Sequence, residues 1–185
     1  WFVREFDRAQ ISINLNNYKV STIHEVYDEA KKLANERGLI VTGSEIVGLI
    51  PLDALIMAGE YYLQKQQRPT GLPEADIIET AVQSLGLNNV VKFNKNEKII
   101  EYAIKIQKRN LISMKNIDFI NELSRNSPAP GGGSVSALAG ALSASLASMV
   151  TALSYDKKEL MKNRNLYNEF GERSQLLKEK LSRLI

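Results

Sequence analysis

The 185-residue sequence contains no cysteine and only one histidine, His24. Without cysteine the chain can form no disulfide framework, no thiolate zinc site and no thiol nucleophile. A single histidine also argues against a histidine-rich metal centre, so we expect no bound metal. Charge of one sign is not in large excess, because 24 basic and 21 acidic side chains leave a net charge of +3. A balance this even gives no reason to expect nucleic-acid binding.

The sequence also lacks a secretory signal, because its N-terminal residues 1–8 are mixed and charged, and we expect a cytoplasmic protein. A long uncharged run extends from Val135 to Ser154. This run has the length of a membrane span, but its serines lower the hydropathy, so we expect a buried helix and no membrane span. Small residues recur in it at four-residue spacing, which permits close approach of a second helix. They are Ala137, Gly140, Ala141, Ala144, Ser145 and Ser148.

A glycine-rich motif, Ser127-Pro-Ala-Pro-Gly-Gly-Gly-Ser134, leads directly into this run. Its prolines restrain the approach, its glycines let backbone N–H groups face a bound group, and its last serine can cap the following helix. A helix start carries unsatisfied donors and partial positive charge, which predicts a site for an anion or a polar carbonyl. The predicted binding residues are Gly131, Gly132, Gly133 and Ser134. The alternative is a flexible junction before a buried helix.

Nucleotide binding is a minor alternative for this motif. No Gly-Lys-Ser/Thr follows Gly133, and the segment from Asn116 to Ser124 reads as a helix where a dinucleotide site needs a strand.

The N-terminal half alternates between strand-like and helix-like patterns. Residues 9–16 alternate strictly between apolar and polar side chains, which predicts a half-buried strand. A helix is expected from Ser21 or Thr22 to about Arg37, and a second strand over residues 39–45. Strand, helix and strand in this order predict parallel strands joined by a right-handed crossover. We therefore expect an α/β subdomain with α+β sandwich-like packing.

Helical spacing continues through the rest of the chain. Helices are expected from Pro51 to Leu63, from Pro73 to Leu85 and over residues 94–104, with a loop at 64–73. The second half is expected to be all-α and to belong to an incomplete helical bundle. Its predicted helices cover residues 114–125, 134–154 and 157–185.

The last predicted helix carries an apolar stripe that its two neighbours cannot enclose. The stripe consists of Leu160, Tyr167, Phe170, Leu177, Leu181 and Leu184. We expect its partners to come from sequence beyond Ile185 or from another subunit. The chain begins without Met and ends inside this amphipathic pattern, so we expect a piece of a longer protein.

Several segments of the chain resemble a known family. Residues 9–18, 22–29, 41–52 and 93–102 resemble the C-terminal subdomain of glutamate formiminotransferase, and residues 127–135 resemble the glycine-rich start of a cyclodeaminase domain. Both sets occur in the order found in the bifunctional formiminotransferase-cyclodeaminases and cover almost the whole chain. The resemblance implies a transferase subdomain over 1–107, a linker over 108–113 and a partial cyclodeaminase domain over 114–185.

The resemblance also implies a two-step folate enzyme of histidine breakdown. The first step moves the formimino group of N-formimino-L-glutamate to tetrahydrofolate, and the second closes the ring, releases ammonia and gives 5,10-methenyltetrahydrofolate. The implied ligands are formiminoglutamate and polyglutamylated tetrahydrofolate, and the implied assembly is a homo-oligomer through the helical domain. The family's transferase histidine and deaminase carboxylate fall outside the matching segments. We therefore assign no catalytic residue, expect the fragment alone to be inactive, and interpret His24 as a structural or surface histidine.

The polar residues of the two predicted strands form a candidate folate surface. A pterin needs alternating donors and acceptors, and Glu45 is suited to pair with its amino and ring N–H groups. The alternative is that this face is merely exposed to solvent. The predicted folate-binding residues are Ser12, Asn14, Asn16, Gly43, Ser44 and Glu45.

Basic residues are concentrated between Lys92 and Lys115. This segment contains seven basic residues and only two acidic ones. Such a stretch is either a solvated linker face or a site that attracts the acidic tail of a folate. The basic residues are Lys92, Lys95, Lys98, Lys105, Lys108, Arg109 and Lys115. A different class of function, a non-catalytic helical oligomerisation module with the small-residue helix as its seam, remains the alternative to an enzyme.

Overall fold

The computed structural model describes residues 2–104 and 111–185. They form two compact units. The first unit contains residues up to 66 and from 74 onward to 105, and the second contains residues 67–73 together with the C-terminal part from 106. We call them the first unit and the helical unit.

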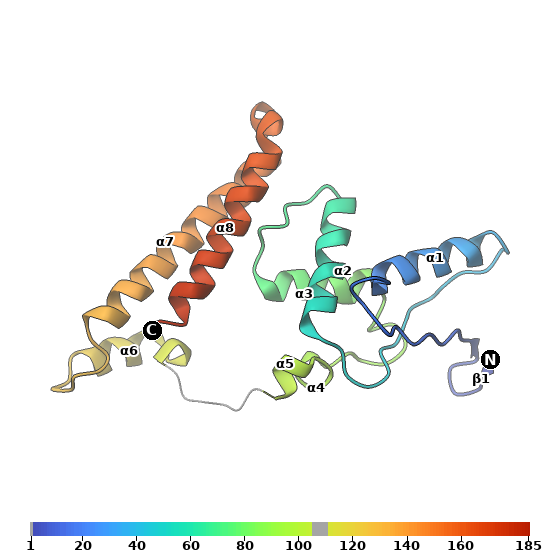
Figure 1. Ribbon diagram of the computed structural model, residues 1–185, viewed down its shortest axis with the longest axis horizontal. Helices are drawn as coiled ribbons and strands as arrows, with labels where there is room; N and C mark the ends of the chain where they lie inside the picture. Colours follow the sequence, from blue (N-terminus) through green and yellow to red (C-terminus); the bar gives the residue numbers. More distant parts are fainter. Residues whose placement is uncertain (1, 105–110) are drawn as a thin grey trace. The chain divides into compact units, whose positions relative to one another are not determined.

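The first unit is rich in helices and contains one small antiparallel sheet (Figure 1). Its elements are β1 (Phe2–Val3), β2 (Arg8–Ala9), α1 (Ile23–Asn35), α2 (Leu52–Lys65), α3 (Glu74–Ser84), α4 (Lys95–Lys98) and α5 (Ile100–Ala103). The expected mixture of helices and strands is therefore present, with far more helix than strand.

The two strands predicted for residues 9–16 and 39–45 do not form. Within residues 2–104 and 111–185, β1 and β2 are the only ladder, and the only parallel bridge joins Ile50 to Ile99. A strand needs a neighbour for its backbone groups, and alternation alone does not supply one. Ile11 and Ile13 accordingly remain 72% and 53% exposed. The prediction of a parallel pair with a crossover was wrong for the described residues.

The helix α1 begins and ends where local signals predicted. The Thr22 hydroxyl accepts from the backbone N–H of Glu25, and the Glu25 carboxylate accepts from the N–H of Thr22. This reciprocal capping box satisfies two N–H groups at the helix start. Gly38 follows the helix with a φ of +70°, a conformation that glycine adopts without steric cost.

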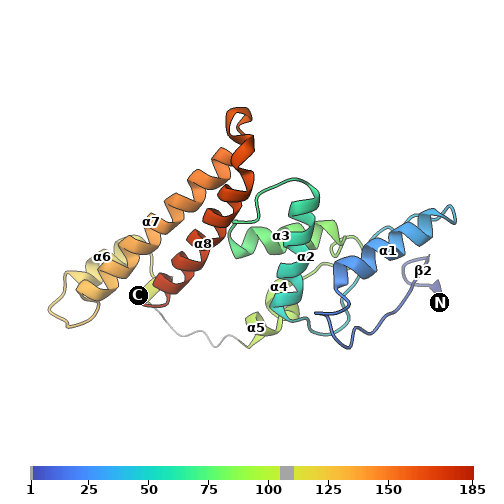
Figure 2. The same cartoon turned by 45° about the horizontal axis from the view of Figure 1, so that its top comes forward.

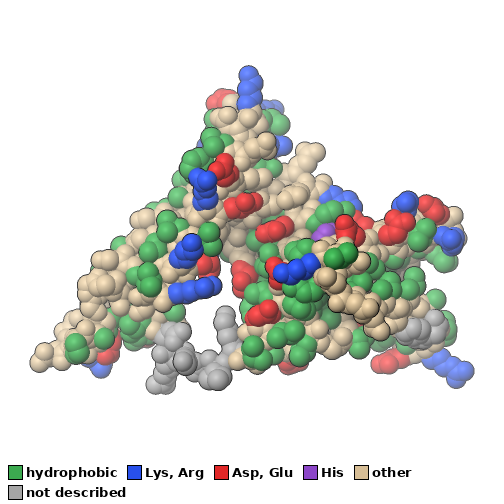
Figure 3. All heavy atoms as spheres, in the orientation of Figure 1, with side chains coloured by type: hydrophobic (Ala, Val, Ile, Leu, Met, Phe, Trp, Pro, Cys, Tyr) green, Lys and Arg blue, Asp and Glu red, His purple; other side chains and the backbone are tan. Residues whose placement is uncertain are grey.

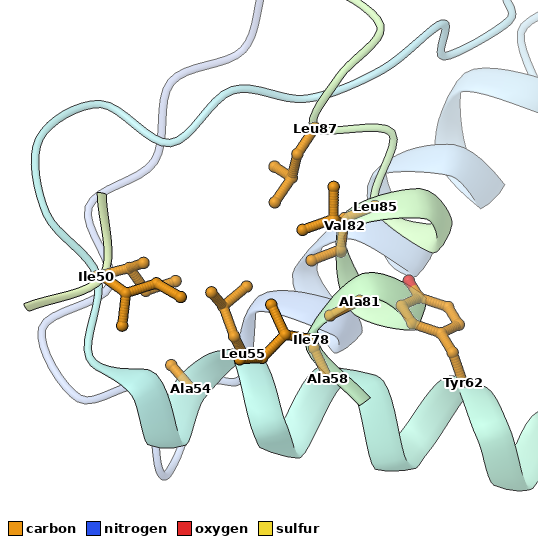
Figure 4. Close-up of a cluster of buried hydrophobic side chains, with 11 residues drawn as sticks. Ile50, Ala54, Leu55, Ala58, Tyr62, Ile78, Ala81, Val82, Leu85 and Leu87 are labelled. Atoms are coloured by element: carbon orange, nitrogen blue, oxygen red, sulfur yellow. The ribbon is translucent and has the colours of Figure 1, made fainter. Parts of the chain in front are cut away.

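The core of the first unit lies where α2 crosses α3 (Figure 4). Leu55, Leu63 and Ile78 are fully buried in the first unit. Figure 4 shows side chains of α2 pointing toward those of α3. Gly59 of α2 lies against the backbone of Ile77, so closely that an added Cβ would be 2.2 Å from the Ile77 carbonyl oxygen. The crossing therefore depends on glycine at this position.

The helical unit consists of a long antiparallel helix pair and shorter elements (Figures 1 and 2). Its elements are η1 (Leu111–Ser113), α6 (Asn116–Leu123), α7 (Gly132–Tyr155), η2 (Lys158–Asn163) and α8 (Arg164–Ser182). The helix predicted over 157–185 thus begins as a 3-10 segment and becomes α-helical at Arg164.

Ser134 does not cap α7, contrary to the prediction. The helix begins at Gly132 with Gly131 as its N-cap, so Ser134 already lies within the first turn. Glycine is accepted at this position without a side-chain bond. The Ser134 hydroxyl instead donates to the carbonyl oxygen of Ile185, at 3.1 Å.

The small residues of α7 face α8, as their spacing predicted. Ala137, Ala141, Ala144 and Ser148 are buried, and Gly140 lies under the Leu181 side chain. The opposite side of α7 is exposed, so the expectation of a fully buried helix was wrong for that side. It carries Leu142, Leu146, Met149, Val150 and Leu153, and Figure 3 shows hydrophobic side chains at the surface over this helix. By length and composition, α7 also meets the requirements of a membrane-crossing helix.

The apolar stripe of α8 is covered only in part. Leu181 packs over Gly140, whereas Phe170, Leu177 and Leu184 are about half exposed or more. The helix pair covers one edge of the stripe, because two helices meet along a single line of contact.

Candidate functional site

The segment Gly43-Ser44-Glu45 packs closely against residues 85–89. A Cβ on Gly43 would be 2.8 Å from the Asn89 Cβ and 2.9 Å from the Gly86 carbonyl oxygen, so no larger residue fits. The Asn89 amide donates to the Thr42 carbonyl at 2.9 Å. The backbones of residues 43 and 86 can approach closely because both residues are glycine.

Ser44 contributes to this anchoring through its side chain and its backbone. Its hydroxyl donates to the Leu85 carbonyl at 2.7 Å, and its N–H donates to the Gly86 carbonyl at 3.3 Å. The serine predicted to meet folate therefore has its hydroxyl proton engaged inside the protein. The next residue, Glu45, is exposed.

Ser12, Asn14 and Asn16 lie exposed in the extended segment that follows β2. Just before this segment, the Arg8 guanidinium donates to the hydroxyl of Thr42 at 2.7 Å. This hydrogen bond connects the segment to residues 39–45. The polar residues therefore offer donors and acceptors to solvent.

The glycine loop opens onto the start of α7. The first intrahelical bond runs from the N–H of Val135 to the Gly131 carbonyl at 3.1 Å, so the preceding N–H groups have no acceptor within the helix. A Cβ on Gly132 or Gly133 would meet nothing within 4 Å. The loop thus presents backbone donors beside open space, as an anion or carbonyl site requires.

His24 is a core residue, in agreement with its interpretation as structural. Its side chain is 7% exposed, stacks on Tyr61 with 4.3 Å between ring centroids, and lies 3.0 Å from the Thr22 hydroxyl through Nε2. Its Nδ1 has no hydrogen-bond partner among the described residues. Burial lowers the pKa of His24, although the carboxylates of Glu25 and Asp28 oppose this effect.

Beside His24 lies a polar cluster around Asp28 that sequence patterns did not suggest. The Asp28 carboxylate accepts from Tyr61 at 2.8 Å, from Tyr62 at 3.0 Å and from Lys65 at 2.5 Å. Burial raises the pKa of Asp28, but these three hydrogen bonds outweigh it and bring the pKa below its ordinary value. The available signal was the spacing Tyr61-Tyr62-x-x-Lys65, which places both tyrosines and the lysine within one turn of α2.

We expect the free energy of unfolding to fall as the pH drops below the ordinary histidine pKa of 6.5. In that range the unfolded state binds a proton at His24 that the folded state, with its lowered pKa, does not yet bind, so protonation favours unfolding. Asp28 adds its own loss only at lower pH, because its folded pKa is also lowered. Urea unfolding between about pH 8 and about pH 5 measures the effect.

The control for this pH dependence is His24→Phe, which keeps an aromatic ring for stacking on Tyr61 and removes the titrating group. Its unfolding midpoint should vary less between the same two pH values. An equal dependence in both proteins would show that other groups cause it.

Carboxylates of the helical unit are engaged in side-chain contacts. Asp156 pairs with Arg164 at 3.2 Å, and Glu169 pairs with Arg173 at 3.0 Å. Glu172 accepts from the Thr70 hydroxyl at 2.7 Å, and Glu179 pairs with Lys178 at 3.0 Å. In the described residues no group of three or more His, Asp or Glu side chains forms a potential metal site.

Only some residues of the basic stretch lie in the part of the chain that the structure describes. Lys98 donates to the Ile46 carbonyl at 3.1 Å, and Lys92 and Lys95 line a groove beside α3 that has both polar and apolar walls. Lys105, Lys108 and Arg109 lie outside the described residues.

Two family models match the chain in succession. The formiminotransferase domain matches residues 1–105, and the formiminotransferase-cyclodeaminase model matches residues 115–185. This chain belongs to the formiminotransferase-cyclodeaminase family. The resemblance found in the sequence is thereby confirmed.

Individual family members agree with this assignment. The chain is 40% identical over 162 residues to the formimidoyltransferase-cyclodeaminase of Dictyostelium discoideum and 39% identical over 161 residues to that of Rattus norvegicus. Each match covers 86% of this chain and 30% of the relative. The glutamate formimidoyltransferase of Thermoplasma acidophilum is 36% identical over 83 residues, which cover 45% of this chain and 26% of that protein. The chain thus spans about a third of the length of its bifunctional relatives.

Proposed function

We propose that this chain is part of a bifunctional folate enzyme of histidine breakdown. The enzyme transfers the formimino group of N-formimino-L-glutamate to tetrahydrofolate and then cyclises the product to 5,10-methenyltetrahydrofolate with release of ammonia. The succession of the two family matches along one chain carries this proposal. We expect a cytoplasmic enzyme.

The first unit contributes folate-binding surface. Glu45 directly follows Ser44, whose hydroxyl and N–H bond to the carbonyls of Leu85 and Gly86, and its exposed carboxylate can accept from the amino and ring N–H groups of a pterin. Gly43 allows this segment to lie close to Gly86 and Asn89. Ser12, Asn14 and Asn16 extend the same polar character along the preceding segment. In this arrangement Ser44 acts as a positioning residue for Glu45.

The helical unit contributes the glycine loop of the deaminase site. The N–H groups at the start of α7 supply positive potential and hydrogen-bond donors to a polar oxygen of the folate. Gly131, Gly132 and Gly133 keep this surface free of side chains, and Ser134 lies within the first turn of the helix. No catalytic residue is assigned within the described residues.

We propose that the basic stretch binds the acidic tail of a polyglutamylated folate. Lys92 and Lys95 line one groove beside α3 with Asn88 and Asn94, and the acidic Glu79 lines it as well. Each exposed lysine contributes little on its own, so several contacts must act together, and added salt must weaken them.

Gly132→Val in the full-length enzyme should lower deamination about tenfold or more and leave formimino transfer unchanged. The new side chain meets no protein atom within 4 Å, so the fold tolerates it while the space beside the N–H groups is filled. Loss of one charge-assisted contact corresponds to about 1.5–3 kcal/mol. Ammonia release and formimino transfer, measured separately, test this expectation.

Ser136→Val is the matched control, because it adds the same side chain at an exposed position of α7 beyond the glycines. Its deamination rate should equal that of the parent. Full deamination by Gly132→Val would remove the glycine loop from the deaminase site.

The alternative is a non-catalytic helical oligomerisation module. The exposed apolar side of α7 favours association of the helical unit with a further copy, and we propose a homo-oligomer in either case. Formimino transfer by the full-length protein, together with a folate-dependent rise in its unfolding temperature, supports the enzyme. Absence of both would favour the module.

A further inference from the structure

Residues 67–73 connect α2 to α3 in the sequence, yet they pack as part of the helical unit. Thr70 is 4% exposed, and Gly71 is also buried. Burial of a short polar loop is unusual, because loops generally remain at the surface where water satisfies their backbone. We call residues 67–73 the clasp.

The centre of the clasp is a backbone crossing between two glycines. A Cβ on Gly71 would be 2.6 Å from the carbonyl carbon and 2.7 Å from the Cα of Gly171. A Cβ on Gly171 would be 3.0 Å from the Thr151 hydroxyl and 3.3 Å from the Gly71 Cα. Glycine within a helix is less favourable than alanine. Gly171 lies within α8, so the close approach of the clasp supplies a physical reason for glycine there.

Polar groups of α7 and α8 meet the clasp around this crossing. The Ser148 hydroxyl, which is 4% exposed, donates to the Gly71 carbonyl at 3.0 Å and accepts from the Gln175 amide at 2.8 Å. The Thr70 hydroxyl donates to Glu172 at 2.7 Å. The N–H of Thr70 donates to the Asn168 side-chain oxygen at 3.4 Å. The clasp is therefore hydrogen-bonded to both helices, through Gly71 to α7 and through Thr70 to α8.

We propose that the clasp is a structural element of the helical unit, and that α7 and α8 carry a built seat for it. The seat consists of Ser148, Asn168, Gly171 and Glu172, and it fits an extended Thr-Gly segment. Ser148 is a polar residue in a mainly apolar helix, and without the clasp its hydroxyl donor would lose the Gly71 carbonyl.

With the clasp, the helical unit has bounds that differ from those of the family matches. Residues 67–73 fall inside the formiminotransferase match, which covers 1–105, whereas the cyclodeaminase match begins at 115. The helical unit is then discontinuous in sequence. The proposal holds whether or not the two proposed activities are present.

Hydrogen exchange on the full-length protein tests the clasp. Thr70→Val keeps the shape of the side chain and removes its hydroxyl, and Gly171→Ala places a methyl group in the crossing. Both should speed exchange of the amides around Ser148 in α7 and around Gly171 in α8, by about tenfold for each 1.4 kcal/mol of lost protection. Arg68→Ala, an exposed position of the clasp, should leave exchange in both helices unchanged.

Unchanged exchange in α7 and α8 with both variants would overturn the proposal and reduce residues 67–73 to a connecting loop. A second measurement does not depend on destabilisation. Because the chain has no cysteine, Thr70→Cys combined with Glu172→Cys gives a unique pair for a short thiol crosslinker. The link should form readily in the folded protein and should not form between Thr70→Cys and Glu179→Cys, about two turns farther along α8. Equal crosslinking of both pairs would also contradict the clasp.

Discussion

Gly59→Ala should destabilise the first unit by about 2–3 kcal/mol, a large fraction of the stability of a small domain. The added Cβ would lie 2.2 Å from the carbonyl oxygen and 2.6 Å from the Cγ2 of Ile77. The oxygen belongs to the backbone of α3, so a side-chain rotation cannot relieve the clash. Alanine's better helix propensity returns about 1 kcal/mol at most, so the two helices must move apart.

Denaturant unfolding followed by circular dichroism measures this loss. Gly140→Ala is the comparison, because the added Cβ there meets the tip of the Leu181 side chain, at 2.9 Å. A flexible side chain can adopt another rotamer at a cost of about 1 kcal/mol. Equal losses in the two variants would contradict the rigid crossing of α2 and α3.

Glu45→Ala in the full-length enzyme should weaken folate binding by about 1.5–3 kcal/mol, roughly ten- to a hundred-fold in affinity. The carboxylate is proposed to accept two N–H groups of the pterin, and alanine would leave both without a protein partner. Because Glu45 is exposed, the stability of the fold should change little. Titration with tetrahydrofolate gives the affinity.

Two variants separate this contact from a general loss of negative charge. Glu45→Gln keeps one acceptor and removes the charge, so its loss of affinity should be intermediate. Glu36→Ala removes an exposed carboxylate at the end of α1 and should leave affinity unchanged. Unaltered binding by Glu45→Ala would exclude Glu45 from the folate site.

Helix positions followed from the sequence because their signals are local. The capping box at Thr22 and Glu25 and the glycine at 38 fixed the ends of α1 within a few residues. The small residues of α7 likewise predicted its contact face correctly, since residues four apart share one side of a helix. The family, too, was recognisable from short segments of the sequence.

The errors occurred where a local pattern depended on a distant partner. Alternation over residues 9–16 predicted a strand, but a strand forms only when another segment accepts and donates along its edge. Ser134 carried the right side chain for a cap, yet the helix began two residues earlier at glycine. A sequence pattern indicates which secondary structure a segment can adopt, and the segments packed around it determine whether that structure forms.

The sequence by itself determined the positions of the main helices and the family to which the chain belongs. The tertiary structure alone decided that Asp28 binds Tyr61, Tyr62 and Lys65, and that Ser44, the neighbour of Glu45, bonds to Leu85. It also decided that Gly71 crosses Gly171, a hundred residues farther along the chain. These contacts join segments far apart in the chain, and their stability comes from burial and hydrogen bonding that no short stretch of sequence encodes.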